Sequence, residues 1–235
     1  SAIIFSWLII QNDKVQTLLI SKVTTLIEKR INTKISIGKV NFQPFNKILL
    51  EDVLIEDVNN DTLIAAKTLK ISILWFNTDQ NILKINKVGL SNALINFKSD
   101  STGTLNLDAF IKKLSPPDTS KATAPEGKPL GLEFKDISIE NSNFRLSSYK
   151  PAKQNYGINF EDIDIKDLNI DARNLSIKGD TIAMLINSLS GKEKSGFKID
   201  KFRAEFSLCN KHLNFDKLRI KAEGSNLQLP YLHMT

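Results

Sequence analysis

The sequence predicts a mainly β protein, in which two N-terminal helices precede a long, curved antiparallel β-sheet that forms a groove. Of the 235 residues, 41% are hydrophobic and 25% are charged, which is typical of globular chains and excludes disorder. Many short segments alternate apolar and polar residues at a spacing of roughly eight to twelve residues, as in an antiparallel meander. The abundance of Ile and Asn and the scarcity of Ala disfavour helix and suit strands joined by Asn turns.

The first ten residues form an apolar segment without any charge. As a helix they would extend about 15 Å, which is half of the ~30 Å hydrocarbon core of a bilayer. The segment has no basic region and no small-residue cleavage site, so it is not an intact signal peptide. We therefore interpret residues 1–11 as the end of a transmembrane helix whose first half precedes this numbering; the alternative is a buried strand or a short core helix. The predicted membrane anchor consists of Ile3, Ile4, Phe5, Trp7, Leu8, Ile9 and Ile10.

Residues 12–34 are predicted to form an amphipathic helix. Asp13 can cap its N-terminus with Gln16 as the capping-box partner, and Lys29 and Arg30 fall in the last turn, where cations favour the helix dipole. The apolar stripe, which repeats at helical spacing, must cover either a bilayer surface or the open end of a β-structure. We favour the second, because the polar face is not especially basic. The stripe consists of Val15, Leu18, Leu19, Val23, Leu26 and Ile27.

The net charge of +6 and the isoelectric point of about 9.2 are weak indications of an anionic partner. Beside a membrane, each nearby cation contributes roughly 1 kcal/mol to the attraction of anionic headgroups. The candidates are Lys22, Lys29, Arg30 and Lys34, which as a solvated helix face would need no such role.

From residue 35 onward the apolar period changes to two, and the chain divides into two β-segments. Residues 35–114 form the first, with a predicted bulge at Gly38, a turn at 59–61 and a short helix over 106–114. Residues 115–131 contain four prolines and no periodicity, so we predict a flexible loop. Residues 132–235 continue the groove.

A short pattern recurs among the strands: an Asp, an aliphatic residue, any residue, and a second aliphatic residue. We interpret it as a turn-favouring Asp at the entrance of a strand with one apolar face. The pattern begins at Asp52, Asp136, Asp162 and Asp167, and with one insertion at Asp216.

Strands with one apolar face can pack as a closed sandwich or remain an open trough, and composition does not decide between them. An open trough would expose enough apolar surface to need a partner, and beside a membrane anchor the natural partner is an acyl chain. For each candidate the alternative is an ordinary core position. The candidate lining residues are Ile37, Val40, Phe42, Val53, Ile55, Leu69, Ile71, Ile73, Ile95 and Phe97.

The sequence indicates neither catalysis nor a metal site. One cysteine with two histidines, His212 and His233, supplies too few ligands for zinc. Asp162, Asp164 and Asp167 lack the glycine and the terminal glutamate of an EF-hand loop. No phosphate-binding loop or hydrolase motif is present, and the basic residues are too evenly mixed with acidic ones for a nucleic-acid surface. We expect no enzyme activity, no cofactor and no nucleic-acid partner.

Three segments in order carry a resemblance to a known family. They are the N-terminal helices over 1–34, the pair 35–42 and 50–57, and the segment 61–73. Together they resemble the N-terminal region of the TamB and AsmA-like proteins of diderm bacteria, and the Gly103-to-Asn106 phrase is similar to their Gly-x-x-Asn turn. The resemblance covers residues 1–115 and, more loosely, the rest. The richness in Ile, Lys and Asn suggests an organism of low G+C content, with the Bacteroidota as a candidate.

This resemblance implies a single-pass inner-membrane protein with its bulk in the periplasm, whose β-groove carries phospholipids toward the outer membrane and supports outer-membrane biogenesis. The implied partners are phospholipids, the inner membrane and an outer-membrane barrel protein of the TamA or BamA type, reached through a C-terminal region beyond this sequence. Because the chain stops directly after an alternating run, we expect the membrane-proximal part of a longer protein. The alternative is a structural or chaperone-like translocation and assembly module, whose strand edges pair with client strands in outer-membrane protein assembly.

Overall fold

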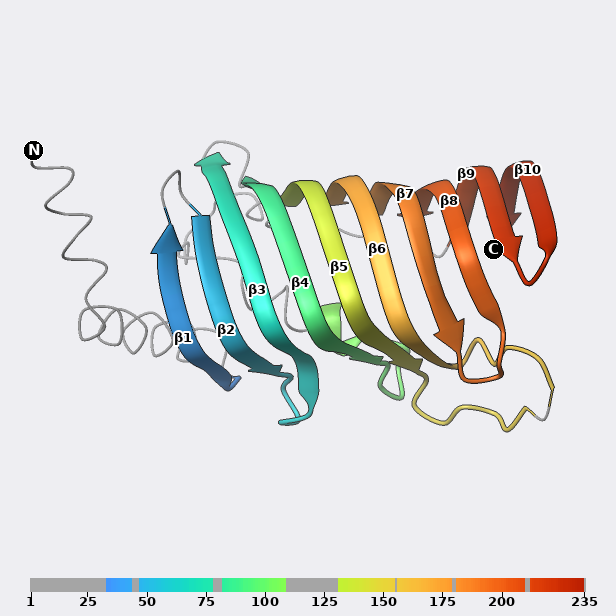
Figure 1. Ribbon diagram of the computed structural model, residues 1–235. Coiled ribbons are helices and arrows are strands. Elements are labelled where there is room, and N and C mark those ends of the chain that lie inside the picture. Colours follow the sequence, from blue (N-terminus) through green and yellow to red (C-terminus); the bar gives the residue numbers. More distant parts are fainter. Residues whose placement is uncertain are drawn as a thin grey trace, which may run out of the picture.

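The computed structural model describes residues 33–43, 47–77, 82–108, 131–154, 156–178, 181–209 and 212–234, which contain one ten-stranded sheet. Figure 1 shows the strands side by side in one row, and the long strands curl so that the sheet bends around the axis of the row. The prediction of a mainly β fold is thus confirmed in this general form. The strands are β1 (Ile35–Gln43), β2 (Lys47–Glu56), β3 (Thr62–Asn77), β4 (Ile82–Lys98), β5 (Gly131–Ser147), β6 (Asp162–Lys178), β7 (Thr181–Glu193), β8 (Lys198–Cys209), β9 (His212–Ala222) and β10 (Ser225–Met234).

The spatial order of the strands equals their order in the sequence, and the sheet is not closed, because β1 and β10 lie at opposite ends of the row. All neighbouring strands are antiparallel except β4 and β5, which run parallel from the pair Ile82 and Gly131 to the pair Lys98 and Ser147. The prediction of a purely antiparallel sheet is therefore wrong at this point. The reason is the long connection over 99–130, since parallel neighbours require a crossover that returns the chain to the starting edge.

Most of the predicted helical segments and the loop lie outside the described residues. This applies to the membrane anchor over 1–11, to residues 12–32 of the amphipathic helix, and to most of the loop over 115–131. Thr33 and Lys34 are described and are not helical, and only residues 106–108 of the predicted short helix are described, as one helical turn. Within the described part of the chain, no helix has the length and apolarity of a membrane span.

Several strands contain a residue in the left-handed backbone conformation at an interior position. Such a conformation is uncommon outside glycine and is best tolerated by Asn and Asp. In five of the six cases, the next residue has a side chain that is at least nine-tenths buried: Val53, Ala93, Ser142, Leu168 or Leu218. The interior residues with positive φ are Asp52 (51°), Asn92 (50°), Asn141 (46°), Asp167 (51°), Lys217 (53°) and Asn174 (54°).

These residues overturn the interpretation of the recurring Asp pattern as a strand entrance. Asp162 does begin β6, but Asp52, Asp136, Asp167 and Asp216 lie inside strands. A left-handed residue resets the alternation of apolar and polar positions without ending the strand, so the sequence alone indicates a break where the strand continues. For this reason the apolar runs 163–165, 168–170 and 175–177 are one strand, β6, instead of three.

The bulge expected at Gly38 is also absent, because the register of β1 and β2 is constant from Ile35 to Gln43. Gly38 lies against Asp52 instead, where an added Cβ would be 3.0 Å from the Asp52 Cβ. The alternation of apolar and polar residues therefore shifts in β1 at Gly38 and in β2 at the left-handed Asp52 beside it, while the two strands stay in register.

Small side chains follow one another across the sheet next to the left-handed residues, and we call this row the crease. Val53 pairs with Ala66 and Ala66 with Ala93, whose N–H donates to the Ser142 Oγ at 3.0 Å. Most of these side chains are small, which lets neighbouring strands pack closely at native density, and Leu168 is the largest member. The crease consists of Val53, Ala66, Ala93, Ser142, Leu168 and Gly191, where an added Cβ would lie 2.7 Å from the Ile165 Cγ2 and 3.5 Å from the Leu168 Cα.

The crease generates a test of the fold with two adjacent alanines. Ala66 is 5% exposed in the crease, whereas Ala65 faces the other side of β3 between Leu54 and Leu94. We expect Ala66→Leu to lower the free energy of unfolding by about 1–3 kcal/mol, because overpacking forces neighbours apart. Ala65→Leu should change it by about 0.5 kcal/mol or less. Urea denaturation of both variants measures the difference; equal losses would contradict a crease at Ala66.

Candidate functional site

An unbroken row of apolar side chains crosses all ten strands, and we call it the central ladder. Each member is the direct cross-strand partner of the next, so the row runs perpendicular to the strands along the sheet. With neighbouring strands ~4.8 Å apart, ten strands give a row of roughly 43 Å. Its members are Val40, Leu50, Leu69, Leu90, Ile139, Ile170, Leu189, Phe202, Ile220 and Leu227.

Shorter apolar rows flank the central ladder on the same face. Leu90 packs in one cluster with Ala66, Ala93 and Ile95, which shows that the residues on both sides of the crease share a face. The first flanking row is Ile35, Ile55, Ile64, Ile95, Phe144 and Ile165. The second is Phe42, Ile48, Ile71, Val88, Ile137, Ala172, Ile186 and Ala204.

The structure brings the predicted lining residues together on this apolar face. Val40 and Leu69 belong to the central ladder, and Val53 belongs to the crease. Ile73 lies in β3, but its side chain is outside the described part. The remaining candidates lie in the flanking rows or beside them: Ile37 opposite Val53, Phe42, Ile55, Ile71, Ile95, and Phe97 opposite Leu146. The seven residues of the predicted membrane anchor are outside the described residues.

Most of this apolar face retains access to its surroundings. Among the described strands, all extensive contacts are between neighbours in the sheet, so no described strand packs on top of the face. The side chains of the central ladder are half-buried from Leu50 to Ile220, except for Leu90 at 9% exposed, and Leu227 is 46% exposed. Side chains sandwiched between two layers would be buried throughout, whereas here most of the ladder is half-buried and Val40 and Leu90 are its buried members. The face is therefore a curved apolar trough that its own side chains partly shield.

Aromatic rings pack against one another in two clusters on the apolar face. Phe97 and Phe144 pack edge to face with ring centroids 5.6 Å apart, and Phe215 contacts both Phe202 and Phe206 at 5.7 and 5.5 Å. Edge-to-face pairs stabilise a cluster beyond the area that they bury. The rings therefore give rigid positions on β4 and β5 in the middle of the row and on β8 and β9 nearer its C-terminal end.

The opposite face of the sheet is polar and carries cross-strand ion pairs. Arg145 lies 3.1 Å from Asp164 and Arg173 lies 3.6 Å from Asp136. Glu133 lies between two lysines, and the hydrogen bonds from Lys178 and Lys84 hold the pKa of its carboxyl below the usual range. Such pairs stabilise antiparallel strands and keep this face hydrated.

Sequence analysis missed much of the trough in the C-terminal strands. The central ladder includes Ile139, Ile170, Leu189, Phe202 and Ile220, and none of them was a candidate. The signal was present for four of them, which belong to alternating runs, but Leu189 has Asn187 and Gly191 two positions away on either side. The residues that share a face could not be assigned, however, since each left-handed residue resets the phase of its strand.

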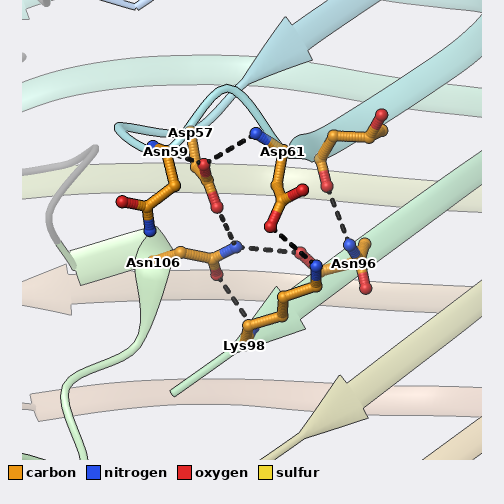
Figure 2. Close-up of polar contacts among 7 residues, drawn as sticks. Asp57, Asn59, Asp61, Asn96, Lys98 and Asn106 are labelled. Atoms are coloured by element: carbon orange, nitrogen blue, oxygen red, sulfur yellow. Dashed lines mark hydrogen bonds and ion pairs between the residues drawn. The ribbon is translucent and has the colours of Figure 1, made fainter. Parts of the chain in front are cut away.

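A buried polar network joins the turn after β2 to the segment that follows β4 (Figure 2). Asp57 is 2% exposed, and its Oδ1 accepts the N–H groups of Asn59 (2.8 Å) and Asp61 (3.0 Å). Its Oδ2 accepts the Asn106 amide at 3.0 Å, and the same amide donates to the Asn96 carbonyl at 3.2 Å. The Asn106 Oδ1 accepts the Lys98 N–H at 3.1 Å. Asn106, singled out in the Gly-x-x-Asn turn, therefore fastens two edge segments to each other.

The turn that starts at Asp57 occurs three times in the described part of the chain, over 57–61, 100–104 and 193–197. Each begins with an acidic residue whose N–H donates to the carbonyl of the fifth residue and whose carboxylate accepts the N–H of the third. The fourth residue has positive φ and is Asn60, Gly103 or Gly196. The turns follow β2, β4 and β7, which run in the same direction, so all three lie at one edge of the sheet.

In two of these turns, hydrogen bonds favour the charged form of the acidic residue. At Asp100, the hydroxyl and the N–H of Thr102 lower the pKa of the carboxyl. Burial tends to raise the pKa of Glu193, which is 4% exposed, but hydrogen bonds from the Ser195 hydroxyl and N–H and from the Asp164 N–H outweigh it and the pKa is lowered. The carboxylates therefore act as turn caps, and the Glu193 turn had not been predicted from the sequence.

The described residues include no cluster suited to metal binding. No group of three or more His, Cys, Asp or Glu side chains among them could hold a metal ion. His212 is exposed at the start of β9, and His233 lies 3.5 Å from Asp216 and beside the Tyr231 ring. Cys209 is half-buried and accepts a hydrogen bond from the Thr181 hydroxyl at 3.4 Å. The apolar trough is thus the best-supported candidate site.

No protein-family model, no curated protein and no solved structure matches this chain.

The polar network yields a stability test. Asp57→Ala would remove the acceptor of the buried Asn106 amide and of the part-buried N–H groups of Asn59 and Asp61, at about 1–3 kcal/mol for each buried group left unpaired. We expect the free energy of unfolding to fall by about 3 kcal/mol. Asp61→Ala is the matched control, because it removes an exposed carboxylate of the same turn, whose 2.8 Å ion pair with Lys98 is worth about 1 kcal/mol or less. If both variants lost the same stability, the network would not be what fastens the turn.

Proposed function

We propose that this protein is a lipid-transfer conduit that holds the acyl chains of phospholipids on its apolar trough and lets them move along the sheet. In this proposal the chain does no chemistry and is not an enzyme. It resembles the TamB and AsmA-like proteins in the order of its sequence motifs, and we propose the same setting: an inner-membrane anchor, a periplasmic sheet and transfer toward the outer membrane.

The observation that carries the proposal is the central ladder, which offers apolar contact without interruption over all ten strands. Each CH₂ group removed from water contributes roughly 0.8 kcal/mol, so a partly shielded acyl chain is held by several kcal/mol. An acyl chain spans about 15 Å, half of a ~30 Å hydrocarbon core. The ladder, at roughly 43 Å, is longer than two such chains placed end to end.

The composition of the ladder supports movement as well as binding. Nine of its ten members are aliphatic, and only Phe202 is aromatic. A chain that shifts by one strand therefore exchanges one aliphatic contact for another of similar energy. Because the rows are perpendicular to the strands, we propose that the acyl chain travels from strand to strand along the row, and that the headgroup remains in water outside the trough.

Photo-crosslinking tests the proposal with two adjacent positions. Ile71 faces the trough, whereas Lys70 faces the polar side between Leu49 and Gly89. With a photo-reactive residue at Ile71, and separately at Ile55, we expect adducts with labelled phospholipid in membrane preparations. The same residue at Lys70 is the matched control and should give few or none. Equal lipid adducts at Ile71 and Lys70, or none at any position, would contradict the conduit.

A second function is favoured by the open ends of the sheet. β10 pairs only with β9, and β1 only with β2, among the described residues. An unpaired strand edge can accept an extended segment of another chain. This would suit a chaperone-like translocation and assembly module acting with an outer-membrane barrel partner. Protein adducts without lipid adducts in the crosslinking experiment would favour this function.

A further inference from the structure

Four cations form a compact cluster on the polar face of β8 and β9, and we call it the basic quartet. Lys201 lies directly opposite Lys221, and Arg203 lies directly opposite Arg219. All four side chains are exposed. The residues between them, Phe202 and Ile220, are members of the central ladder, so the quartet faces away from the apolar trough. The members of the quartet are Lys201, Arg203, Arg219 and Lys221.

The two arginines of the quartet differ from the other two described arginines in having no acidic partner within the described ranges. Like charges directly opposite each other destabilise a pair of antiparallel strands. The other two described arginines avoid this, because Arg145 pairs with Asp164 and Arg173 pairs with Asp136. Within the part of the chain that the structure describes, no carboxylate forms an ion pair with any member of the quartet.

Nearby acidic side chains are already engaged elsewhere. The Asp200 carboxylate lies 3.2 Å from Lys198, and the Glu205 carboxylate lies 2.6 Å from Lys217. Asp216 lies opposite Glu205 and is 3.5 Å from His233. Glu223, in the turn between β9 and β10, is exposed. The four positive charges therefore have no acidic partners of their own among the described residues. A bound anion would reduce the repulsion between them.

The quartet also lines a hollow that contains further hydrogen-bond donors. Asn226 and Gln228 of β10 lie opposite Lys221 and Arg219, and both line the same hollow of about 230 Å³. Amide N–H groups and cations on three adjacent strands thus surround one small space. A guanidinium group matches two oxygens of a tetrahedral oxyanion at once, which an ammonium group does not.

We propose that the basic quartet binds a phosphate group, with Arg203 and Arg219 as its principal ligands. The phosphate can be free in solution or belong to a phospholipid headgroup, since both present the same oxyanion. Because the quartet lies on the face opposite the trough, this site is separate from the proposed acyl-chain site and does not depend on it.

Binding is tested with the full chain and two probes. Inorganic phosphate is titrated calorimetrically, and vesicles of phosphatidylcholine with phosphatidylglycerol are compared with vesicles of phosphatidylcholine alone. We expect the double variant Arg203→Gln with Arg219→Gln to weaken binding roughly tenfold or more, since hydrogen bonds to charged groups are the stronger class. Binding of free phosphate assigns the site to soluble anions, and binding of anionic vesicles alone assigns it to headgroups; both support the proposal.

The matched control removes the same charge from another like-charged pair on the polar face. Lys166 lies opposite Lys192, and both are exposed. The double variant Lys166→Gln with Lys192→Gln should bind as tightly as the parent. Equal weakening in both double variants would reduce the effect to net charge and overturn the proposal, as would the absence of binding to either probe.

Thermal unfolding provides an independent readout. Without phosphate, the Arg203→Gln, Arg219→Gln variant should unfold at the same temperature as the parent or higher, because the repulsion of the two arginines is removed. Phosphate should raise the unfolding temperature of the parent and leave that of this variant unchanged. A parent that phosphate does not stabilise would contradict the site.

Discussion

The described part of the structure depends on one constraint. Its strands form a single sheet with an apolar face, and no other described strand packs on that face. Curvature meets this constraint in part, because side chains on the inside of a bend converge and shield one another. The left-handed residues within the strands, such as Asp52, Asn141 and Asp167, coincide with the most deeply buried positions of that face. The buried side chains there include small ones, Ala93 and Ser142, as well as the larger Leu168.

Three consequences follow from this arrangement. The long strands pair on both sides of the bend, with register shifts beside it such as that between Ile139 and Ser142, so that the apolar rows continue from strand to strand. The charges gather on the other face, where Arg145 and Asp164 and similar pairs lie in water. The edge of the sheet is fixed by capped turns, with Asp57 and Asn106 at their centre. A shielded but accessible apolar trough is thus the form that this sheet takes without a second described layer.

The mainly β class could be predicted from composition and period, because alternating aliphatic residues determine which side of a strand is apolar. The number and length of the strands could not, since a left-handed Asp or Asn inside a strand has the same local signature as a turn. Asp167, for example, separates two apolar runs that both belong to β6. The parallel pairing of β4 and β5 depends on the path of residues 99–130, which local periodicity does not encode. The lining residues of the N-terminal strands were identified individually, but their continuation from Ile139 to Ile220 depends on register.

We propose that the apolar face is open to lipid along the sheet, and a variant at Ile139, in the middle of the central ladder, tests this most directly. A tryptophan is placed at Ile139 or at the adjacent Ser138, which faces the polar side, and its fluorescence is compared with that of the parent, which has two tryptophans. Brominated phospholipid, a contact quencher, should quench the added signal of Ile139→Trp and leave that of Ser138→Trp unchanged. Quenching of neither residue, or of both equally, would contradict an open lipid-binding trough.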